Sequence, residues 1–126
     1  MITATSDSAN YRTTFSNGAH TAYADASPKM GGADAGFRPH DLVEASLACC
    51  INIWLRMYSQ RHEIPLEAVT TTVEMDKTET GVSKFKWNVT LTGDMTPEQH
   101  ERLIAAAAAC PVRRTLEQTL QFPVIE

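Results

Sequence analysis

The chain has 126 residues, 43% of them hydrophobic, which is enough for one compact domain with its own core. Its formal net charge of −4 argues against nucleic-acid binding, which needs clustered Lys and Arg on one face. No apolar run approaches the ~20 residues that span a bilayer. The N-terminal residues lack the basic and apolar segments of a signal peptide. We therefore expect a single domain over residues 1–126, located in the cytoplasm, with no membrane or nucleic-acid partner.

The first third of the chain combines a strand pattern with a long loop. Strand-forming residues flank the pair Asn17-Gly18, which predicts a β-hairpin over roughly 10–25. Residues 26–38 contain three glycines and a proline and predict an irregular loop. A loop of this length inside a domain is often functional. Residues 1–9 are polar, and we expect them to be flexible.

A long helix is predicted from Pro39 to just before Pro65. Proline suits the first helical position, and Asp41 and Glu44 complement the helix dipole there. The helix has about 24 residues, so we expect it to be the central element of the fold. Apolar side chains recur at three- and four-residue steps and form one stripe: Val43, Leu47, Cys50, Ile51, Trp54, Leu55 and Tyr58.

Alternating residues predict two strands over 69–76 and 84–91, each with one buried and one exposed face. Acidic residues on the exposed face of the first strand are expected to pair with lysines on the second.

The last third of the chain begins with Thr96 as a helix cap before Pro97. Pro111 cannot extend that helix, which is therefore predicted to end near Cys110. We expect a short helix over 112–119. A final strand containing Leu120, Phe122 and Val124 is predicted at a sheet edge, because Pro123 lacks an N–H.

Three cysteines form the main chemical clue. An odd number without a secretion signal favours redox or metal chemistry over a disulfide framework. Cys50 lies on the apolar stripe, while Cys49 points about 100° away from it. Vicinal cysteines rarely bond to each other, which makes Cys110 the better partner. The helix start and the basic side chains of Arg113 and Arg114 predict a lowered pKa for the Cys110 thiol.

Simpler interpretations of the cysteines remain open at this point. All three can be small buried side chains in the core. A zinc site completed by His40 or His62 is weakly supported, because no cysteine or histidine pair has the usual ligand spacing. Nucleotide-binding and serine-hydrolase motifs are absent from the sequence. We expect no metal and no bound cofactor.

Two segments resemble a known family. The pattern Pro39-x-Asp-Leu-Val-x-Ala-Ser-Leu-Ala-x-Cys50 precedes the pattern Ala-x-x-Cys110-Pro111-Val112 by 60 residues, counted from Cys50 to Cys110. Together they resemble the osmotically inducible protein C / organic hydroperoxide resistance (OsmC/Ohr) family, over about residues 10–124.

The resemblance implies an α+β, OsmC-like fold with a long central helix, antiparallel sheets and an N-terminal hairpin. It implies an intertwined homodimer with active sites at the dimer interface. It also implies a thiol peroxidase of oxidative-stress defence that reduces organic hydroperoxides, with hydrogen peroxide as a further candidate. Cys50 corresponds to the peroxidatic residue and Cys110 to the resolving residue. An external dithiol, lipoyl-type in better-known members, would regenerate the thiols.

The sequence departs from the family pattern at His40, where the peroxidases carry a glutamate that orients an arginine against the thiolate. Ten helical residues separate this position from Cys50, a distance of about 15 Å. Supporting residues would therefore act through a loop or across a dimer, with Arg12 and Arg38 as candidate arginines. The departure leaves two alternatives: an OsmC-like protein that binds a small hydrophobic ligand, and an interaction module whose cysteines are packing residues.

Overall fold

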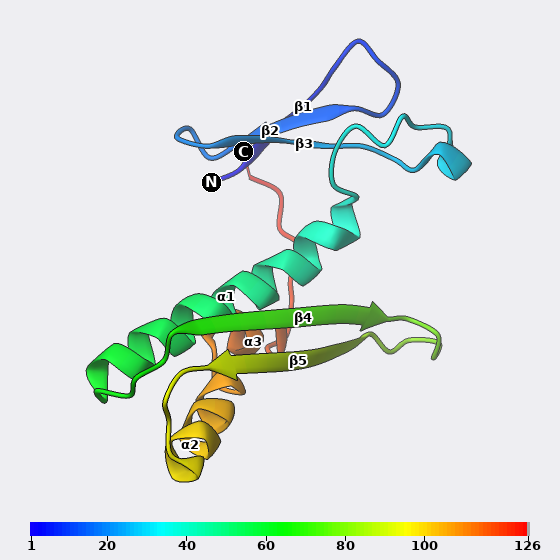
Figure 1. Cartoon of the computed structure of the whole chain (residues 1–126). Coiled ribbons are helices and arrows are strands. Elements are labelled where there is room, and N and C mark those ends of the chain that lie inside the picture. Colours follow the sequence, from blue (N-terminus) through cyan, green and yellow to red (C-terminus); the bar gives the residue numbers. More distant parts are fainter. Residues whose placement is uncertain (126) are drawn as a thin grey trace. The chain divides into compact units, whose positions relative to one another are not determined.

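The computed structural model describes residues 1–125. The chain forms two compact units, residues 1–43 and 44–126, which are described separately (Figure 1). Within residues 1–125, no helix is both long enough and apolar enough to cross a membrane.

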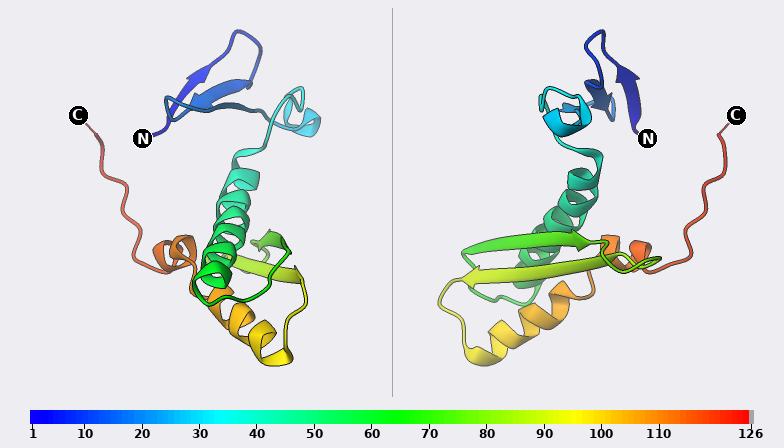
Figure 2. Two further views of the ribbon diagram at one scale, coloured as in Figure 1. Left: turned by 60° about the vertical axis from the view of Figure 1, so that its left-hand side comes forward. Right: turned by 90° about the vertical axis from the view of Figure 1, so that its right-hand side faces the viewer.

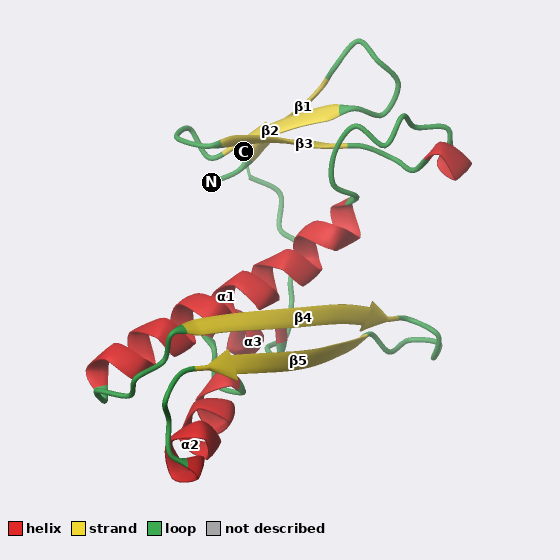
Figure 3. Ribbon diagram, in the orientation of Figure 1, coloured by secondary structure: helices red, strands yellow, loops and turns green. Residues whose placement is uncertain are grey.

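The first unit contains one antiparallel sheet in the order β1-β2-β3. Its strands are β1 (Thr3–Ser6), β2 (Thr13–Ser16) and β3 (Thr21–Ala24) (Figure 3). The predicted hairpin is confirmed as β2 and β3. Strand β1 lies in the polar segment 1–9, where composition predicts flexibility. Strand β1 pairs with β2 through main-chain hydrogen bonds, and the polar side chains of this segment do not predict that pairing.

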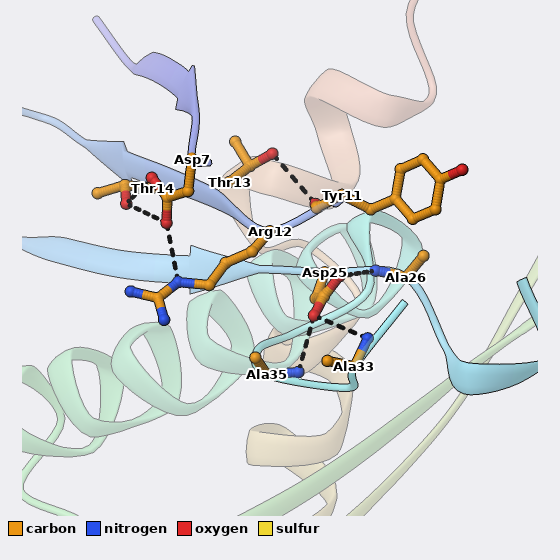
Figure 4. Close-up of polar contacts among 9 residues, drawn as sticks. All are labelled: Asp7, Tyr11, Arg12, Thr13, Thr14, Asp25, Ala26, Ala33 and Ala35. Atoms are coloured by element: carbon orange, nitrogen blue, oxygen red, sulfur yellow. Dashed lines mark hydrogen bonds and ion pairs between the residues drawn. The ribbon is translucent and has the colours of Figure 1, made fainter. Parts of the chain in front are cut away.

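The loop after β3 is organised by Asp25. It contains only the short 3₁₀ helix η1 (Pro28–Met30), so the predicted irregular loop is confirmed. The buried Asp25 carboxylate accepts hydrogen bonds from the N–H groups of Ala26, Ala33 and Ala35 at 2.7, 3.2 and 3.0 Å (Figure 4). The bond from Ala35 is the largest cause that lowers the carboxyl pKa, because it stabilises the ionised form. The carboxylate therefore ties the later residues of the loop back to Asp25, where the loop begins.

Close packing of this loop against β3 explains one of its glycines. A Cβ atom on Gly36 would lie 2.3 Å from the carbonyl oxygen of Tyr23, a distance that real side chains do not reach. Phe37 donates its N–H to that same oxygen at 3.0 Å. Glycine at this position lets the returning loop pair with the end of β3.

The second unit packs helices on one face of a two-stranded sheet (Figure 2). Helix α1 (Pro39–Arg61) and strands β4 (Ala68–Asp76) and β5 (Lys84–Thr92) agree with the predicted elements. The buried residues of the core come from α1, from the segment that follows it, from α2 and from Cys110: Leu47, Ile51, Leu55, Ile64, Leu66, Leu103, Ala107 and Cys110. Alternate residues of both strands pack against this cluster: Val69, Val73, Phe85, Trp87, Val89 and Leu91.

The exposed face of the sheet carries the expected charge pairing. Lys86 Nζ lies 2.8 Å from the Asp76 carboxylate. The side-chain bond with Lys86, followed by bonds from Thr78, holds the pKa of Asp76 well below its usual range. Lys84 pairs with Glu79 of the turn instead of with a β4 residue.

The helices after the sheet follow the sequence signals closely. Helix α2 (Pro97–Ala107) begins with a capping box, in which Thr96 and Gln99 exchange side chain-to-backbone hydrogen bonds of 3.0 and 3.1 Å. Helix α3 (Pro111–Leu116) begins after Cys110, as the proline predicts, and ends three residues before the predicted boundary at 119.

The prediction of a final strand is wrong. Residues 119–125 form no strand, and the side chains of Leu120, Phe122 and Val124 are 52, 89 and 88% exposed. The alternating pattern is present, but a strand forms only where its N–H and C=O groups find a partner. No strand pairs with this segment in the described part of the chain.

Candidate active site: a pair of thiols

The second unit brings two of the three cysteines together. Cys50 is half-buried on α1, and Cys110 is fully buried at the N-cap of α3. Cys50 packs against the core cluster that contains Cys110, the two thiols are close enough for Cys50 to raise the pKa of Cys110, and both are free. Cys49 is exposed, as its helical phase predicts. Cys110, and not Cys49, is therefore the candidate disulfide partner of Cys50.

The expected lowering of the Cys110 thiol pKa is wrong. Burial raises this pKa above its ordinary value of 9.0, and the nearby Cys50 side chain raises it further. The backbone N–H groups of Arg113 and Val112, at the start of α3, act in the opposite direction but are outweighed. Arg113 is bonded to Glu117 at 2.9 Å, so its charge is partly compensated. Cys110 therefore retains its proton at neutral pH.

A tryptophan joins α1 to α2, the helix that precedes Cys110. Trp54 lies four residues after Cys50 on α1, and its indole N–H donates to the carbonyl oxygen of Ala106 at 3.0 Å. Ala106 lies in the last turn of α2, four residues before Cys110. This bond fixes the distance between the two segments that carry the sulfurs. The four-residue spacing between Cys50 and Trp54 indicates that both side chains lie on one side of α1. The apolar stripe by itself identifies Trp54 only as a core residue.

A small cavity lies in the second unit. It has a volume of about 270 Å³, and its apolar lining comes from α1, β5 and α3 through Leu47, Phe85, Trp87 and Leu116. Arg113 and Glu117 supply polar groups to the same cavity. Neither cysteine is among the lining residues, but Leu47 precedes Cys50 by one helical turn and Arg113 follows Cys110 by three residues.

The other predicted site residues lie in the first unit. The Arg12 Nε atom donates to Asp7 at 2.8 Å (Figure 4). The Arg12 guanidinium also stacks over the Tyr23 ring, at 4.6 Å from its centroid. Arg38 is exposed, and its backbone N–H donates to Asp41 at 3.0 Å. His40 is exposed in the first turn of α1. The structure thus places Cys50 and Cys110 at one core cluster, while their redox roles and the supporting roles of Arg12, Arg38 and His40 stay predictions.

The raised pKa of Cys110 predicts a loss of stability at alkaline pH. Above about pH 9 the unfolded chain releases the Cys110 proton before the folded chain does, so the free energy of unfolding falls as the pH rises through this window. We expect the free energy of unfolding, measured by urea denaturation of the reduced protein, to decline more steeply between pH 8 and pH 10.5 in the wild type than in the Cys110→Ala variant. Cys49→Ala is the control and should follow the wild type. Parallel curves for the wild type and Cys110→Ala would contradict the assignment.

The fold and the thiol pair can be compared with known proteins. The OsmC-like protein family model matches residues 31–124. A comparison with curated proteins gives no match. Among solved structures, an OsmC-like protein from Mycoplasma pneumoniae is similar with 18% identity and a TM-score of 0.75, covering 93% of this chain and 86% of that one.

Two further structures come from proteins named for organic hydroperoxide resistance. The Legionella pneumophila protein has 22% identity and a TM-score of 0.64, with 93% of this chain and 88% of that chain covered. OhrB of Bacillus subtilis has 25% identity and a TM-score of 0.59, with coverage of 93% and 89%. These likenesses confirm the predicted α+β fold. Because the family model spans most of the sequence, the chain belongs to the OsmC-like protein family.

Proposed function

We propose that the protein is a cytoplasmic, thiol-dependent peroxidase that reduces organic hydroperoxides and contributes to defence against oxidative stress. The observation that carries this proposal is that Cys50 packs against the core cluster that contains Cys110, near enough to raise the pKa of the Cys110 thiol. The names of the Legionella and Bacillus proteins, which refer to organic hydroperoxide resistance, support the choice of substrate.

The two thiols have different environments, which suggests their separate roles. Cys50 is half-buried and accessible to a substrate, whereas Cys110 is fully buried and protonated. Cys50 is therefore the attacking residue. Its thiolate attacks the terminal oxygen of the hydroperoxide, the O–O bond breaks, and the alkoxide takes up a proton and leaves as an alcohol. The S–H group of Cys110 can donate a hydrogen bond to the Cys50 sulfur while that sulfur is ionised.

The product of the first step is a sulfenic acid on Cys50, which Cys110 then resolves. The Cys110 sulfur attacks the Cys50 sulfur, water is released, and a disulfide forms. An external dithiol returns both residues to thiols and is oxidised in turn. The chemistry requires no metal or bound cofactor.

The cavity beside Leu47 offers a place for the organic part of the substrate. Its apolar walls can accept a short alkyl or aryl group, while Arg113 at its edge can contact a polar end. A volume of about 270 Å³ is small for a stable ligand-binding pocket but sufficient for a compact hydroperoxide. Arg12, Arg38 and His40 are proposed as supporting residues that act on the Cys50 thiolate.

Substitution of the cysteines tests the assigned roles. Cys50→Ser should abolish peroxide-dependent oxidation of a dithiol, because serine does not form a sulfenic acid. Cys110→Ser should still form one equivalent of sulfenate, which dimedone labelling detects, but should lose turnover. Cys49→Ser is the matched control and should retain turnover. Wild-type activity in Cys50→Ser would refute the proposal.

We also propose that the active protein is an intertwined homodimer with its sites at the interface. The support is the exposed, alternating apolar segment at the end of the chain, with Phe122 and Val124 almost fully exposed. Such a segment gains a partner if it adds as a strand to a second copy.

Light scattering tests the oligomeric state. The full chain should have twice the mass of one protomer, and deletion of residues 120–126 should weaken or abolish the dimer. The double substitution Lys29→Ala and Lys84→Ala, at exposed positions outside this segment, should leave the mass unchanged. A monomeric full chain at micromolar concentration would contradict the proposal.

A further inference from the structure

Aromatic and basic side chains line α1 beyond the thiol pair. Trp54 and Tyr58 lie one and two turns after Cys50, at four-residue steps that place all three on one side of the helix. Both rings are half-buried, so part of each remains accessible. His62 follows four residues after Tyr58, with its ring 4.2 Å from the tyrosine ring between centroids.

Arginines from two other helices cover these rings. The Arg114 guanidinium of α3 lies 5.9 Å from the centroid of the Trp54 ring. The Arg102 guanidinium of α2 lies 5.9 Å from the centroid of the Tyr58 ring. We call the combined surface the arginine–aromatic strip; it consists of Trp54, Tyr58, Arg61, His62, Arg102 and Arg114.

The charges of the strip are not neutralised by the protein itself. Arg102 donates to Nδ1 of His62 at 3.3 Å, although Glu98 lies four residues earlier on the same helix, at a spacing that favours an ion pair. Within residues 1–125, none of the three strip arginines forms an ion pair with a carboxylate. The neighbouring Arg113, in contrast, pairs with Glu117. A chain with a net charge of −4 thus concentrates exposed positive charge beside its thiols.

The shape of the strip suits a macromolecule better than a small ligand. The hollow between Trp54, Met57, Tyr58 and Arg61 has a volume of about 80 Å³, well below the roughly 300–1,000 Å³ of small-molecule pockets. The part of α1 from Cys50 to Tyr58, along which the strip begins, is about 12 Å long. Tryptophan, tyrosine and arginine are the residues enriched at the centres of protein–protein interfaces. The unpaired arginines select an acidic partner.

We propose that the strip is the docking surface for an acidic carrier protein that delivers the reducing dithiol to Cys50. This inference rests on the proposed peroxidase function. Cys110 is fully buried and Cys50 half-buried, so the oxidised pair is open to a dithiol on a narrow arm but not to a broad protein surface. Docking on the strip places such an arm within one or two helical turns of Cys50.

The electron transfer balances through a mixed disulfide. One carrier thiolate attacks the Cys50 sulfur, the Cys50–Cys110 bond breaks, and Cys110 leaves as a thiolate that takes up a proton. The second carrier thiol then attacks the carrier sulfur of the mixed disulfide and releases Cys50. Two electrons pass to the protein, and the carrier leaves as an intramolecular disulfide.

The test compares one dithiol in two forms, free dihydrolipoamide and the same group on a reduced lipoyl domain of negative net charge. In the double variant Arg102→Glu and Arg114→Glu, we expect KM for the domain to rise about tenfold or more, equivalent to about 1.4 kcal/mol of binding free energy. The fold increase in KM for the domain should be more than about five times the fold change in KM for free dihydrolipoamide, because the free reductant does not need the docking surface. The wild-type KM for the domain should also rise with salt, and the variant's should not.

The paired substitution Lys29→Glu and Lys84→Glu is the matched control, because it makes the same change of net charge at exposed positions outside the strip. It should leave the KM for the lipoyl domain within about twofold of wild type. An equal effect of the double variant on both reductants, or no effect on either, overturns the docking proposal. A change of oligomeric mass in the double variant also overturns it, because the strip would then be an interface between copies of the chain.

Binding of the oxidised lipoyl domain, measured by NMR titration, separates this proposal from the peroxidase function. Binding that the double variant weakens, without peroxide turnover in the wild type, would sink the peroxidase function but support the surface as a docking site. Turnover with free dihydrolipoamide and no binding of the domain would overturn the docking site alone.

Discussion

The site depends on the contact between α1 and the break between α2 and α3. Pro111 ends one helix and begins the next, and Cys110 occupies the turn between them. The Trp54 indole bond to Ala106 fastens this turn to α1 four residues beyond Cys50. Around it, Leu55, Leu103 and Cys110 are completely buried. A buried helix contact therefore holds both cysteines at one core cluster, although 60 residues separate them in the chain.

The same contact gives the two thiols different properties. Burial keeps Cys110 protonated, and the N–H groups at the start of α3 only partly offset that effect. Cys50 stays half-exposed on the same helix face. One thiol is placed to meet a substrate and the other to meet only its neighbour, which is the division of roles that a two-cysteine peroxidase requires. The arginine–aromatic strip continues from this contact along α1, so access and docking would share one side of the second unit.

Much of this could be predicted from local sequence. Pro39, the Thr96-Pro97 pair and Pro111 each act through their own backbone geometry, and the structure places helix boundaries at all three. The alternation of apolar and polar residues in β4 and β5 likewise indicates that one face of each strand is covered. The phase of α1 distinguished Cys50 from Cys49 correctly, because a helix face is a property of spacing alone.

The failures concern features that depend on distant parts of the chain. The neighbours of Cys110 in the sequence, Arg113 and the helix start, favour a lowered thiol pKa. Burial by other elements outweighs them and raises that pKa. Phe122 and Val124 alternate as a strand does, but no strand within the described chain pairs with them. Strand β1 shows the reverse case, in which a polar segment finds a partner through its main chain. The arginines over Trp54 and Tyr58 come from two later helices, and no single segment reveals them.

The proposed redox pair of Cys50 and Cys110 can be tested by a single measurement. Mass spectrometry of the reduced protein after one equivalent of cumene hydroperoxide tests it most directly. We expect the loss of two hydrogens per chain, mapped by proteolysis to a bridge between the peptides that contain Cys50 and Cys110. An unchanged mass, or oxidation confined to the exposed Cys49, would contradict it.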